Sequence, residues 1–527
     1  MSLWEQLLLL GAFTFALSFQ KTICMSVLIN VIFILYAAAL VAITAYCLMQ
    51  LNLLYKYRQH HRRLRRQKNG TSKVGAGIEH RPDRDWPFVT IQLPIFNEMY
   101  VVERLIDNIM QLDYPRDRFE VHVLDDSTDE TVDITRRKVE EYRAKGFNIA
   151  QYHRTNRQGY KAGALKEAMQ HARGEFVAIF DADFLPRPDF LKATLAHFED
   201  EKVGVVQTRW EHLNENYSLI TRLQALQLNV HFRVEQKGRH AGNYLLQFNG
   251  TAGVWRRQTI DDAGGWEADT LTEDLDLSIR AQLKGWKIIF LEEVGSPAEL
   301  PAEMHGLKSQ QFRWMKGGAE TARKMLPTVW RSDLSFGQKI HATMQLVAST
   351  VFVCVFIMGV FSVPILLYWS NSHLGSRLLE YCYVGMLALI AVHYTANVEM
   401  QQESGAYWKR LAKFILLFPL FLALSMGLSL HNTVAVVQGW LGKKSAFVRT
   451  PKFNITGLKD NLWNRKYLSK RISWTTAMEG LLAVFFTYAA WSGYQSGNYG
   501  FLAMHLSMAL GYSFIFYYSL RHVRIRR

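Results

Sequence analysis

The sequence predicts a soluble α/β domain inserted between α-helical membrane segments, and three features indicate this arrangement. Long uncharged apolar runs fill residues 1–54 and 341–520, whereas residues 55–335 are charged and mixed. Strand-like and helix-like segments alternate within that central part. Acidic pairs follow two of the expected strands, at the edge where ligands of such sheets bind. Because a soluble core does not need apolar runs of this length, we expect an integral membrane protein.

The membrane segments are predicted from length, since about 20 apolar residues span a bilayer. Five runs are expected to cross, at 28–54, 341–368, 378–398, 474–492 and 499–520. Residues 5–19 form a shorter apolar run, which is expected to be either a further span or an interfacial helix. The cysteines all lie in or beside apolar runs, at Cys24, Cys47, Cys354 and Cys382. The soluble domain therefore has none, which excludes disulfides there and fits a reducing, cytosolic face.

Three basic clusters predict the orientation in the membrane. They are "KYRQHHRRLRRQK" (56–68), "GKKSAFVRTPK" (442–452) and "RHVRIRR" (521–527), each beside an apolar run. By the positive-inside rule these clusters and the soluble domain face the cytosol, at an inner or plasma membrane, or at the Golgi in a eukaryote. Nucleic-acid binding is the weaker interpretation, because topology and anionic lipids account for basic clusters beside a membrane. An even number of crossings must then separate the domain from 442–452, so we expect residues 411–441 to lie along the interface.

These patterns divide the chain into six segments. We expect an N-terminal transmembrane region (1–56), a basic juxtamembrane linker (57–84), a catalytic domain with interfacial helices (85–335), transmembrane and interfacial helices (336–441), a cytosolic loop (442–472) and a C-terminal transmembrane hairpin with a basic tail (473–527).

The central domain alternates between two kinds of segment. Strands are predicted at 88–96, 119–126, 147–153 and 175–183, and helices at 98–112, 130–146 and 161–174. This alternation, with nearly continuous apolar strands, predicts a parallel, doubly wound sheet of the Rossmann-like kind. Because ligands of such sheets bind beyond the carboxyl ends of the strands, the residues that follow each strand are the candidates for a site.

Asp125 and Asp126 end the second predicted strand, in "LDDSTDET". The Asp–Ser–Thr–Asp run is also an ordinary N-cap for the helix that follows. Capping accounts for Ser127 to Asp129, but it does not account for two adjacent acids at the strand end. We therefore predict that Asp125 and Asp126 bind a nucleotide.

Asp181 and Asp183 end the fourth predicted strand, in "FDADF". Two carboxylates two residues apart in an extended chain point the same way. Such a pair can hold a hard divalent cation whose remaining ligands are diphosphate oxygens and water. The ion would neutralise a diphosphate leaving group. A D-x-D pair alone is common by chance, but the acid pair at the earlier strand end strengthens the prediction.

Glu273 and Asp274 open a predicted amphipathic helix within "ADTLTEDLDLSIRAQLKGW" (268–286). Acids in the first turn are also favoured by the helix dipole alone. Displacing a sugar diphosphate with a hydroxyl nucleophile needs a base, and a carboxylate at a helix start can supply it. We take Glu273 and Asp274 as candidate catalytic residues, with Asp274 as the base.

Two further motifs supply groups that can bind phosphate and sugar. Lys161 lies with Arg154 and Arg157 in "HRTNRQGYKAGAL" (153–165), where cations and helix amides form a diphosphate cradle, although solvated basic loops are equally common. In "SQQFRW", helical spacing places Gln310, Arg313 and Trp314 on one face. A surface helix with one packed Trp is the plainer interpretation of that motif. In a sugar site, the Arg would clamp phosphate, the Gln would contact hydroxyls and the indole would stack on a pyranose.

The motifs together resemble those of the membrane-bound family 2 glycosyltransferases, which include cellulose, hyaluronan and chitin synthases. Strand-end DD, D-x-D, T-E-D and Q-x-x-R-W occur here in that order before a membrane block, and the resemblance covers residues 85–455. "DDSTD", "GGW" and "QQ-x-RW" are most similar to the cellulose-synthase-like A and C groups, the mannan and xyloglucan-backbone synthases. Those groups usually have His where this chain has Phe312.

The resemblance implies a GT-A fold, inversion at the anomeric carbon and a Mg²⁺ or Mn²⁺ ion. It implies nucleotide-sugar contacts from Asp125, Asp126, Lys161, Gln310 and Arg313, a metal site at Asp181 and Asp183, and Asp274 as the base. Acceptor contacts are implied for Trp314 and for Gly250 and Thr251 in "FNGTAG". "FVRTPK" resembles the gating loop F-x-V-T-P-K, with Phe447, Thr450, Pro451 and Lys452 matching and Arg449 in place of Val.

We therefore expect a processive, inverting hexosyltransferase that polymerises a β-linked polysaccharide and moves it across the membrane. β-1,4-Glucan from UDP-glucose is the first expectation, and β-mannan from GDP-mannose is the alternative. A second alternative is a membrane glycolipid synthase of the ceramide or sterol glucosyltransferase type, which the gating-like loop opposes. A catalytically inactive scaffold or transporter is disfavoured because every motif keeps its acids. The expected partners are the nucleotide sugar, the growing polysaccharide and the bilayer, without nucleic acid.

Overall fold

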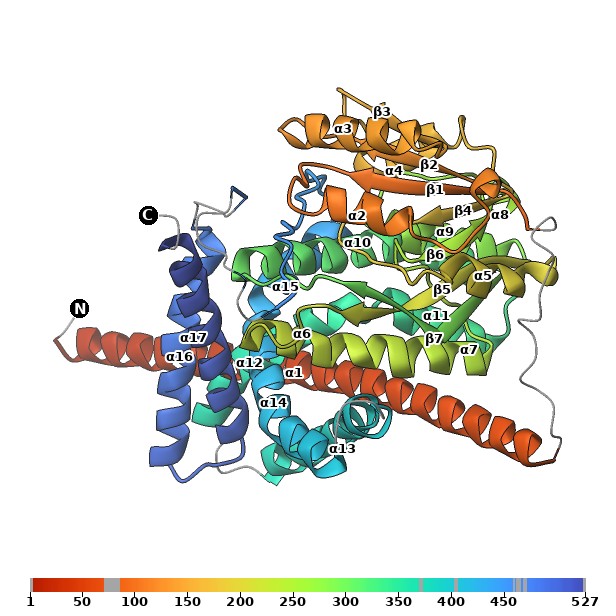
Figure 1. The fold of residues 1–527 in the computed structure, drawn as a ribbon. Helices are drawn as coiled ribbons and strands as arrows, with labels where there is room; N and C mark the ends of the chain where they lie inside the picture. The colour runs from red at the N-terminus through yellow and green to blue at the C-terminus, as the bar shows by residue number, and fades with distance from the viewer. Residues whose placement is uncertain are drawn as a thin grey trace.

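The computed structural model describes residues 3–70, 86–368, 373–401, 406–457, 460, 466–467 and 472–524. Much of the predicted linker 57–84, part of the loop 442–472 and the end of the basic tail lie outside these residues. Figure 1 shows the sheet and its covering helices grouped at one end of the molecule, with the membrane helices beside them. Helix α1 (Leu3–Gly70) is a single element that contains both the 5–19 and the 28–54 runs.

The central domain is built on a seven-stranded sheet with the order β3-β2-β1-β4-β6-β5-β7. Its strands are β1 (Val89–Ile95), β2 (Phe119–Asp125), β3 (Ile149–His153), β4 (Phe176–Ile179), β5 (Val203–His212), β6 (Gly253–Arg256) and β7 (Lys287–Ala298). Four of the seven were predicted, and β4 ends earlier than expected, at Ile179. The predicted GT-A-like α/β class is confirmed.

One strand departs from the parallel arrangement that the sequence predicts. β6 pairs antiparallel with both β4 and β5, whereas β1 pairs parallel with β2 and β4, and β5 pairs parallel with β7. The expectation of an all-parallel sheet is therefore wrong at β6. The physical reason is the connection before it, since residues 248–252 turn at the carboxyl edge of β4 and send the chain back. The reversal brings that turn to the edge where the candidate residues lie.

The helices of the domain cover both faces of the sheet. They include α2 (Val102–Ile109), α3 (Thr131–Ala144), α4 (Tyr160–Ala168), α5 (Phe190–Leu195), α8 (Arg257–Asp262) and α9 (Glu273–Leu283). Val89, Ile91 and Leu93 of β1 pack in one apolar core, and Val177 and Ile179 of β4 pack in the core of the opposite face. Burial on both faces explains why the strands are nearly continuous apolar runs.

Two groups of helices join the domain to the membrane part. The first is the run of α6 (Leu219–Val230), the π-helical turn His231–Gln236 and α7 (Lys237–Gly242), which lies along α1. A capping box between Ser218 and Thr221 opens α6. The second is α10 (Met304–Arg331), which carries "SQQFRW" and is followed by α11 (Phe336–Leu346). Glu303 caps α10 by accepting a hydrogen bond from the His305 amide at 2.6 Å.

Among the described residues, three helices are long and apolar enough to cross a membrane: Val27–Arg63, Ala348–Leu367 and Tyr407–Gly427. α12 (Val351–Tyr368) makes up most of the second of these, and α13 (His373–Tyr394), α16 (Trp474–Gln495) and α17 (Leu502–Arg524) occupy the other predicted spans. α16 and α17 have 22 and 23 residues but are less apolar than that group.

The segment 411–441, whose interfacial position stays a prediction, is divided between two helices. The segment forms α14 (Tyr407–Gly427), which is one of the three spanning candidates, and a separate helix α15 (Ser429–Trp440). Pro419 lies within α14 without ending it. The polar residue His431 belongs to α15, where its Nε2 donates to the carbonyl of Lys308 on α10 at 2.9 Å. A tertiary contact with α10 therefore satisfies the Nε2 group of His431.

A buried ion pair connects α10 to the C-terminal helix hairpin. Lys308 Nζ lies 2.9 Å from Glu479 of α16, and it also donates to Thr476 Oγ1 at 3.3 Å. Lys308 is 6% exposed and Glu479 is fully buried. Removing one partner of such a pair leaves the other charge buried without compensation, which costs far more than removing both.

We predict that Lys308→Met lowers the free energy of unfolding by about 3 kcal/mol, because Glu479 is left unpaired. The double variant Lys308→Met/Glu479→Leu should recover most of this loss. Thermal unfolding of the full-length protein in detergent measures both, with Lys409→Met at an exposed position as the control. A single variant as stable as the control would contradict the stabilising role of the pair.

Candidate active site

A cavity of about 190 Å³ lies at the carboxyl edge of the sheet, where β1, β2 and β4 end. The predicted site residues that line it are Asp126, Lys161, Asp181, Asp183, Gly250, Glu273, Asp274, Gln310, Arg313, Trp314, Phe447, Thr450 and Lys452. These residues come from the ends of β2 and β4, the turn before β6, the three helices α4, α9 and α10, and the 442–457 loop. The structure therefore brings together motifs that are more than 300 positions apart in the sequence.

The D-x-D carboxylates each contact a lysine. Lys161 Nζ lies 2.5 Å from Asp181 Oδ1 and donates to the Gly250 carbonyl at 2.8 Å. Lys452 Nζ lies 2.6 Å from Asp183 Oδ2. Burial lowers the pKa of Lys161, but Asp181, Glu273 and Asp274 together outweigh this and raise it. Lys161 therefore stays cationic where a diphosphate would need charge neutralisation.

Asp274 lies in the first turn of α9, where the Leu275 amide donates to its Oδ1 at 2.9 Å. Burial and the neighbouring charge of Glu273 raise the pKa of Asp274 from 3.8 to about 7, although Lys161 opposes the shift. Burial also raises the pKa of Glu273. A carboxyl with a pKa near the working pH is well suited to accept a proton from a hydroxyl.

A turn at residues 249–252 lies directly against Asp274. Gly250 has φ +81°, and a Cβ there would lie 3.0 Å from Asp274 Oδ2. Gln207, which is fully buried, holds the turn by accepting from the Asn249 amide at 2.8 Å and donating to the Ala252 carbonyl at 3.1 Å. Thr251, also fully buried, accepts from the Asp181 amide at 2.8 Å. The turn thus connects the D-x-D strand to the base, with Gly250 at the cavity and Thr251 behind its wall.

Asp125 and Asp126, at the end of β2, lie in different environments. Asp126 lines the cavity and accepts two hydrogen bonds from Arg154, both at 2.7 Å. Asp125 is fully buried behind the wall, where it accepts from the Ser127 amide at 2.8 Å and from Gln151 at 2.7 Å. Of the two predicted nucleotide ligands, only Asp126 faces the cavity in this structure.

Gln310, Arg313 and Trp314 share the cavity face of α10, as their spacing predicts. Arg313 Nη2 donates to Thr450 Oγ1 at 2.8 Å, and its guanidinium lies 4.6 Å from the centre of the Phe447 ring. Burial lowers the pKa of Arg313. The "SQQFRW" and "FVRTPK" motifs therefore contact each other across the cavity.

The gating-like loop lies inside the cavity mouth and is held at both ends. Lys316 of α10 donates to Ser445 Oγ at 2.6 Å, and Glu299 accepts from the amides of Phe453 and Asn454 at 2.9 Å. Pro451 does not line the cavity. Arg449, the position that departs from the family pattern, pairs with Glu98 at 3.1 Å.

Several cavity residues were not predicted from the sequence. They are Glu98, Trp210, His212, Asn249 and Glu299. Glu98 follows β1, Trp210 and His212 end β5, and Glu299 follows β7. The rule that site residues follow strand ends covers Glu98, Trp210, His212 and Glu299. These four were missed because the rule was not applied to β1 and because β5 and β7 were not predicted.

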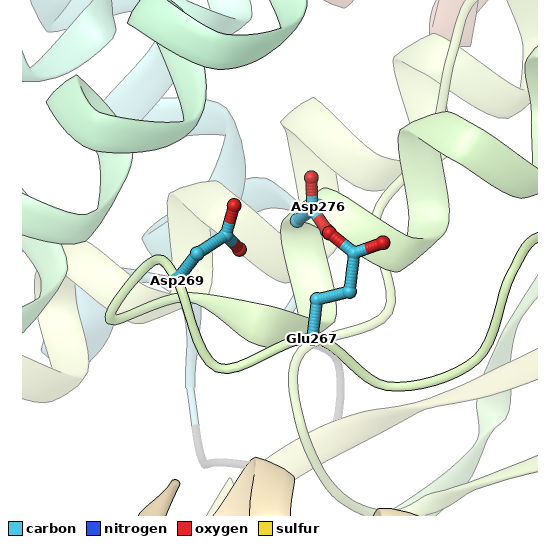
Figure 2. Close-up of side chains that lie close together, drawn as sticks. All are labelled: Glu267, Asp269 and Asp276. Atoms are coloured by element: carbon cyan, nitrogen blue, oxygen red, sulfur yellow. The ribbon is translucent and has the colours of Figure 1, made fainter.

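The geometry also shows which acids suit a metal ion. Asp181 and Asp183 offer hard carboxylate oxygens at the cavity wall, a donor set that fits Mg²⁺ or Mn²⁺ once diphosphate completes it. Figure 2 shows a different acidic group, Glu267, Asp269 and Asp276, whose oxygens lie within 4.8 Å of one another. Lys324 Nζ lies 2.6, 2.9 and 3.1 Å from these three carboxylates, and Arg280 Nη2 lies 2.8 Å from Asp276, so two cations already offset part of their negative charge.

Comparisons with known proteins agree with the motifs. Residues 87–317 match the family described as glycosyltransferase like family 2. The chain is 46% identical over 264 residues to glucomannan 4-beta-mannosyltransferase 1 of Oryza sativa subsp. japonica, covering 49% of this chain and 50% of the relative. It is 43% identical over 262 residues to the probable glucomannan 4-beta-mannosyltransferase 11 of the same organism, covering 49% and 46%.

The solved structure of the mannosyltransferase PcManGT from Pyrobaculum calidifontis, in complex with GDP-Man and Mn²⁺, is 22% identical. It covers 78% of this chain and 100% of that chain, with a TM-score of 0.47. The chain spans about half the length of the curated relatives that it matches. The ordered motifs and the family match agree that residues 87–317 form a domain similar to glycosyltransferase like family 2.

Proposed function

We propose that this protein is an inverting mannosyltransferase that extends a β-1,4-linked mannan or glucomannan from GDP-mannose. The observation that carries the proposal is Asp274, a half-buried carboxyl with a pKa of about 7 in the same cavity as the D-x-D pair and the "SQQFRW" helix. The names of the rice relatives favour mannosyl transfer over the glucosyl transfer that the motifs first suggested.

The reaction follows from the groups that face the cavity. Asp274 takes the proton of the acceptor hydroxyl, whose oxygen forms a bond to the anomeric carbon of the donor sugar. The bond from that carbon to the diphosphate breaks, and GDP leaves with the electron pair. Lys161 and Arg313 stabilise the negative charge that develops on the diphosphate. A divalent ion at Asp181 and Asp183, when bound, would neutralise part of the same charge.

In this proposal, two lysines that pair with carboxylates would bind phosphate once the nucleotide sugar enters the cavity. In the structure Lys161 contacts Asp181 and Lys452 contacts Asp183. If Asp181 and Asp183 held a divalent ion, Lys161 and Lys452 would be free to donate hydrogen bonds to the phosphate oxygens of the donor. We infer that Lys452 and the 442–457 loop close over the diphosphate by this exchange.

A polymer product is favoured over a glycolipid by the position of the site. Gln310 and Trp314 lie on α10, which packs against α15 and, through Lys308, against α16. A growing chain held at Trp314 would leave the cavity beside membrane helices. We infer a cytosolic catalytic domain in a multi-pass protein whose product passes through the bilayer.

The donor and product are tested together with purified full-length protein. We expect GDP release from GDP-mannose in the presence of Mg²⁺ or Mn²⁺, and a labelled polymer that an endo-β-1,4-mannanase digests. UDP-glucose is the comparison donor, and a cellulase-sensitive product from it would replace mannan with glucan. A chloroform-soluble product from either donor would overturn the polymer assignment in favour of a glycolipid synthase.

We predict that Asp274→Asn reduces the rate of transfer by roughly 10²–10⁴-fold, because the amide cannot accept the proton. GDP affinity, measured by calorimetry, should stay close to the wild-type value, and Asp133→Asn on the exposed face of α3 is the control. In the wild type, kcat/KM should fall as the pH drops below about 7, because protonation removes the base. Asp274→Asn activity equal to the control, or a rate independent of pH between 5 and 7 (both sides of the pKa, about 7), would remove Asp274 as the base.

We predict that Gly250→Ala also lowers the transfer rate, on the order of a hundredfold, since displacing a catalytic group by an ångström has this effect. The new Cβ would lie 3.0 Å from Asp274 Oδ2 and 3.6 Å from Lys161 Nζ. Gly265→Ala is a matched control, because Gly265 has φ +76° with nothing within 4 Å. Equal rates for the two variants would mean that backbone strain, and not contact with Asp274, sets the effect.

A further inference from the structure

One face of α10 extends from the cavity to the segment that leads into the base. Arg313 lines the cavity on this face. Helical spacing places four further residues along the same face: Gly317, Glu320, Thr321 and Lys324. All four lie against the segment 267–272, which directly precedes Glu273 and Asp274 in the chain. A single helix face thus carries a cavity cation and contacts the backbone that presents the base.

Gly317 allows α10 to lie directly against the backbone of that segment. Gly317 is buried, and a Cβ added there would lie 2.6 Å from Thr272 Cγ2 and 2.9 Å from both the Leu271 carbonyl carbon and the Thr272 nitrogen. Two of these three atoms belong to the backbone, which cannot move aside as the end of a flexible side chain can. Because glycine is less favourable than alanine inside a helix, helix formation does not account for Gly317, whereas this close contact does.

Two hydrogen bonds fix the position of the segment along α10. Glu320 Oε2 accepts from the Leu271 amide at 2.9 Å. The hydroxyls of Thr272 and Thr321 lie 3.0 Å apart, within hydrogen-bond distance, and Thr321 is fully buried. The Thr272 carbonyl in turn accepts from the Asp276 amide at 3.1 Å, in the first turn of α9. The contacts of α10 therefore reach the helical turn that carries the base.

The same turn of α10 is also packed on its other side. Gly439 of α15 lies against it, since a Cβ there would lie 2.6 Å from the Lys316 carbonyl oxygen. Lys316 Nζ donates to Ser445 Oγ at 2.6 Å, at the start of the gating-like loop. This turn of α10 therefore cannot move away from the base without displacing α15 or the loop.

We propose that Gly317 and Thr321 are positioning residues, which set the distance between Asp274 and the side chains of α10 that face the cavity. The inference rests on the proposed role of Asp274 as the base, but not on the identity of the donor sugar. Burial lowers the pKa of Arg313, and the charge of Asp274 is among those that oppose this shift. The distance between α10 and the base therefore affects the electrostatics of the site as well as its geometry.

The test compares two adjacent glycines of α10 in the full-length protein. Gly317→Ala introduces the close contacts with Thr272, whereas Gly318→Ala, the matched control, places its Cβ in ordinary contact 3.6 Å from Ser349 Oγ. We expect Gly317→Ala to lower kcat for transfer from GDP-mannose roughly a hundredfold, as for the displacement of a catalytic group by about an ångström. GDP affinity, measured by calorimetry, should fall by a much smaller factor, because Lys161 lies outside α10 on α4.

A second pair of variants tests the hydrogen bond between the two hydroxyls. Thr321→Val keeps the shape of the side chain and leaves the Thr272 hydroxyl without this partner, so we expect kcat to fall by about tenfold. Thr321→Ser keeps the hydroxyl and should restore most of the wild-type kcat. The melting temperature of each variant in detergent shows whether the fold is retained.

Equal kcat values for the two alanine variants would overturn the role of Gly317. A kcat for Thr321→Ser as low as that for Thr321→Val would overturn the role of Thr321. If Gly317→Ala lowers kcat and GDP affinity by the same factor and also lowers the melting temperature, the glycine serves folding and the proposal is wrong. If the wild-type protein transfers only from another donor, the proposed donor fails, and the same four variants measured with that donor still decide the positioning role.

Discussion

Compensation of buried charge at the carboxyl edge of the sheet is the constraint on which the rest of the site depends. Asp181, Asp183 and Asp274 line one cavity, and a carboxylate as buried as that of Asp183 is costly without a compensating cation. Their cations come from elsewhere in the chain: Lys161 from α4 and Lys452 from the gating-like loop. The site is therefore complete only when a helix of the domain and a loop between membrane helices dock on the same strand ends. The pKa of Asp274 is a consequence of the same burial.

The reversed direction of β6 determines where the turn before it lies, because a parallel strand would begin at the opposite edge of the sheet. Its antiparallel direction brings the turn at residues 249–252 to the functional edge, between the D-x-D strand and α9. Gln207, fully buried in β5, then holds the turn through hydrogen bonds to its backbone. Gly250 allows the turn to approach Asp274 at a distance that a side chain would not permit. Sheet topology and one glycine thus determine the position of the turn that we propose lies beside the acceptor.

Helix α10 couples the site to the membrane part of the protein. Its cavity face carries Gln310, Arg313 and Trp314, and its opposite side carries Lys308 and Lys316. Lys308 pairs with Glu479 of α16, and Lys316 holds the start of the gating-like loop at Ser445. A second connection runs from Asn249 through His231 and Glu235 to Gln50 of α1. Polar contacts therefore link the wall of the cavity to α1 and α16, which lie toward opposite ends of the chain.

The sequence by itself determined the domain class, the edge of the sheet that carries the site, and most of its residues. Hydrophobic patterning specified β1 to β4, and acids after strands specified Asp126, Asp181 and Asp183, because these signals are local. Tertiary structure alone decided that β6 is reversed and that Asp125 lies behind the wall. It also decided which lysine neutralises which acid, and that Asn249 meets His231. These outcomes depend on pairs far apart in the chain, and local periodicity carries no information about which distant partners meet.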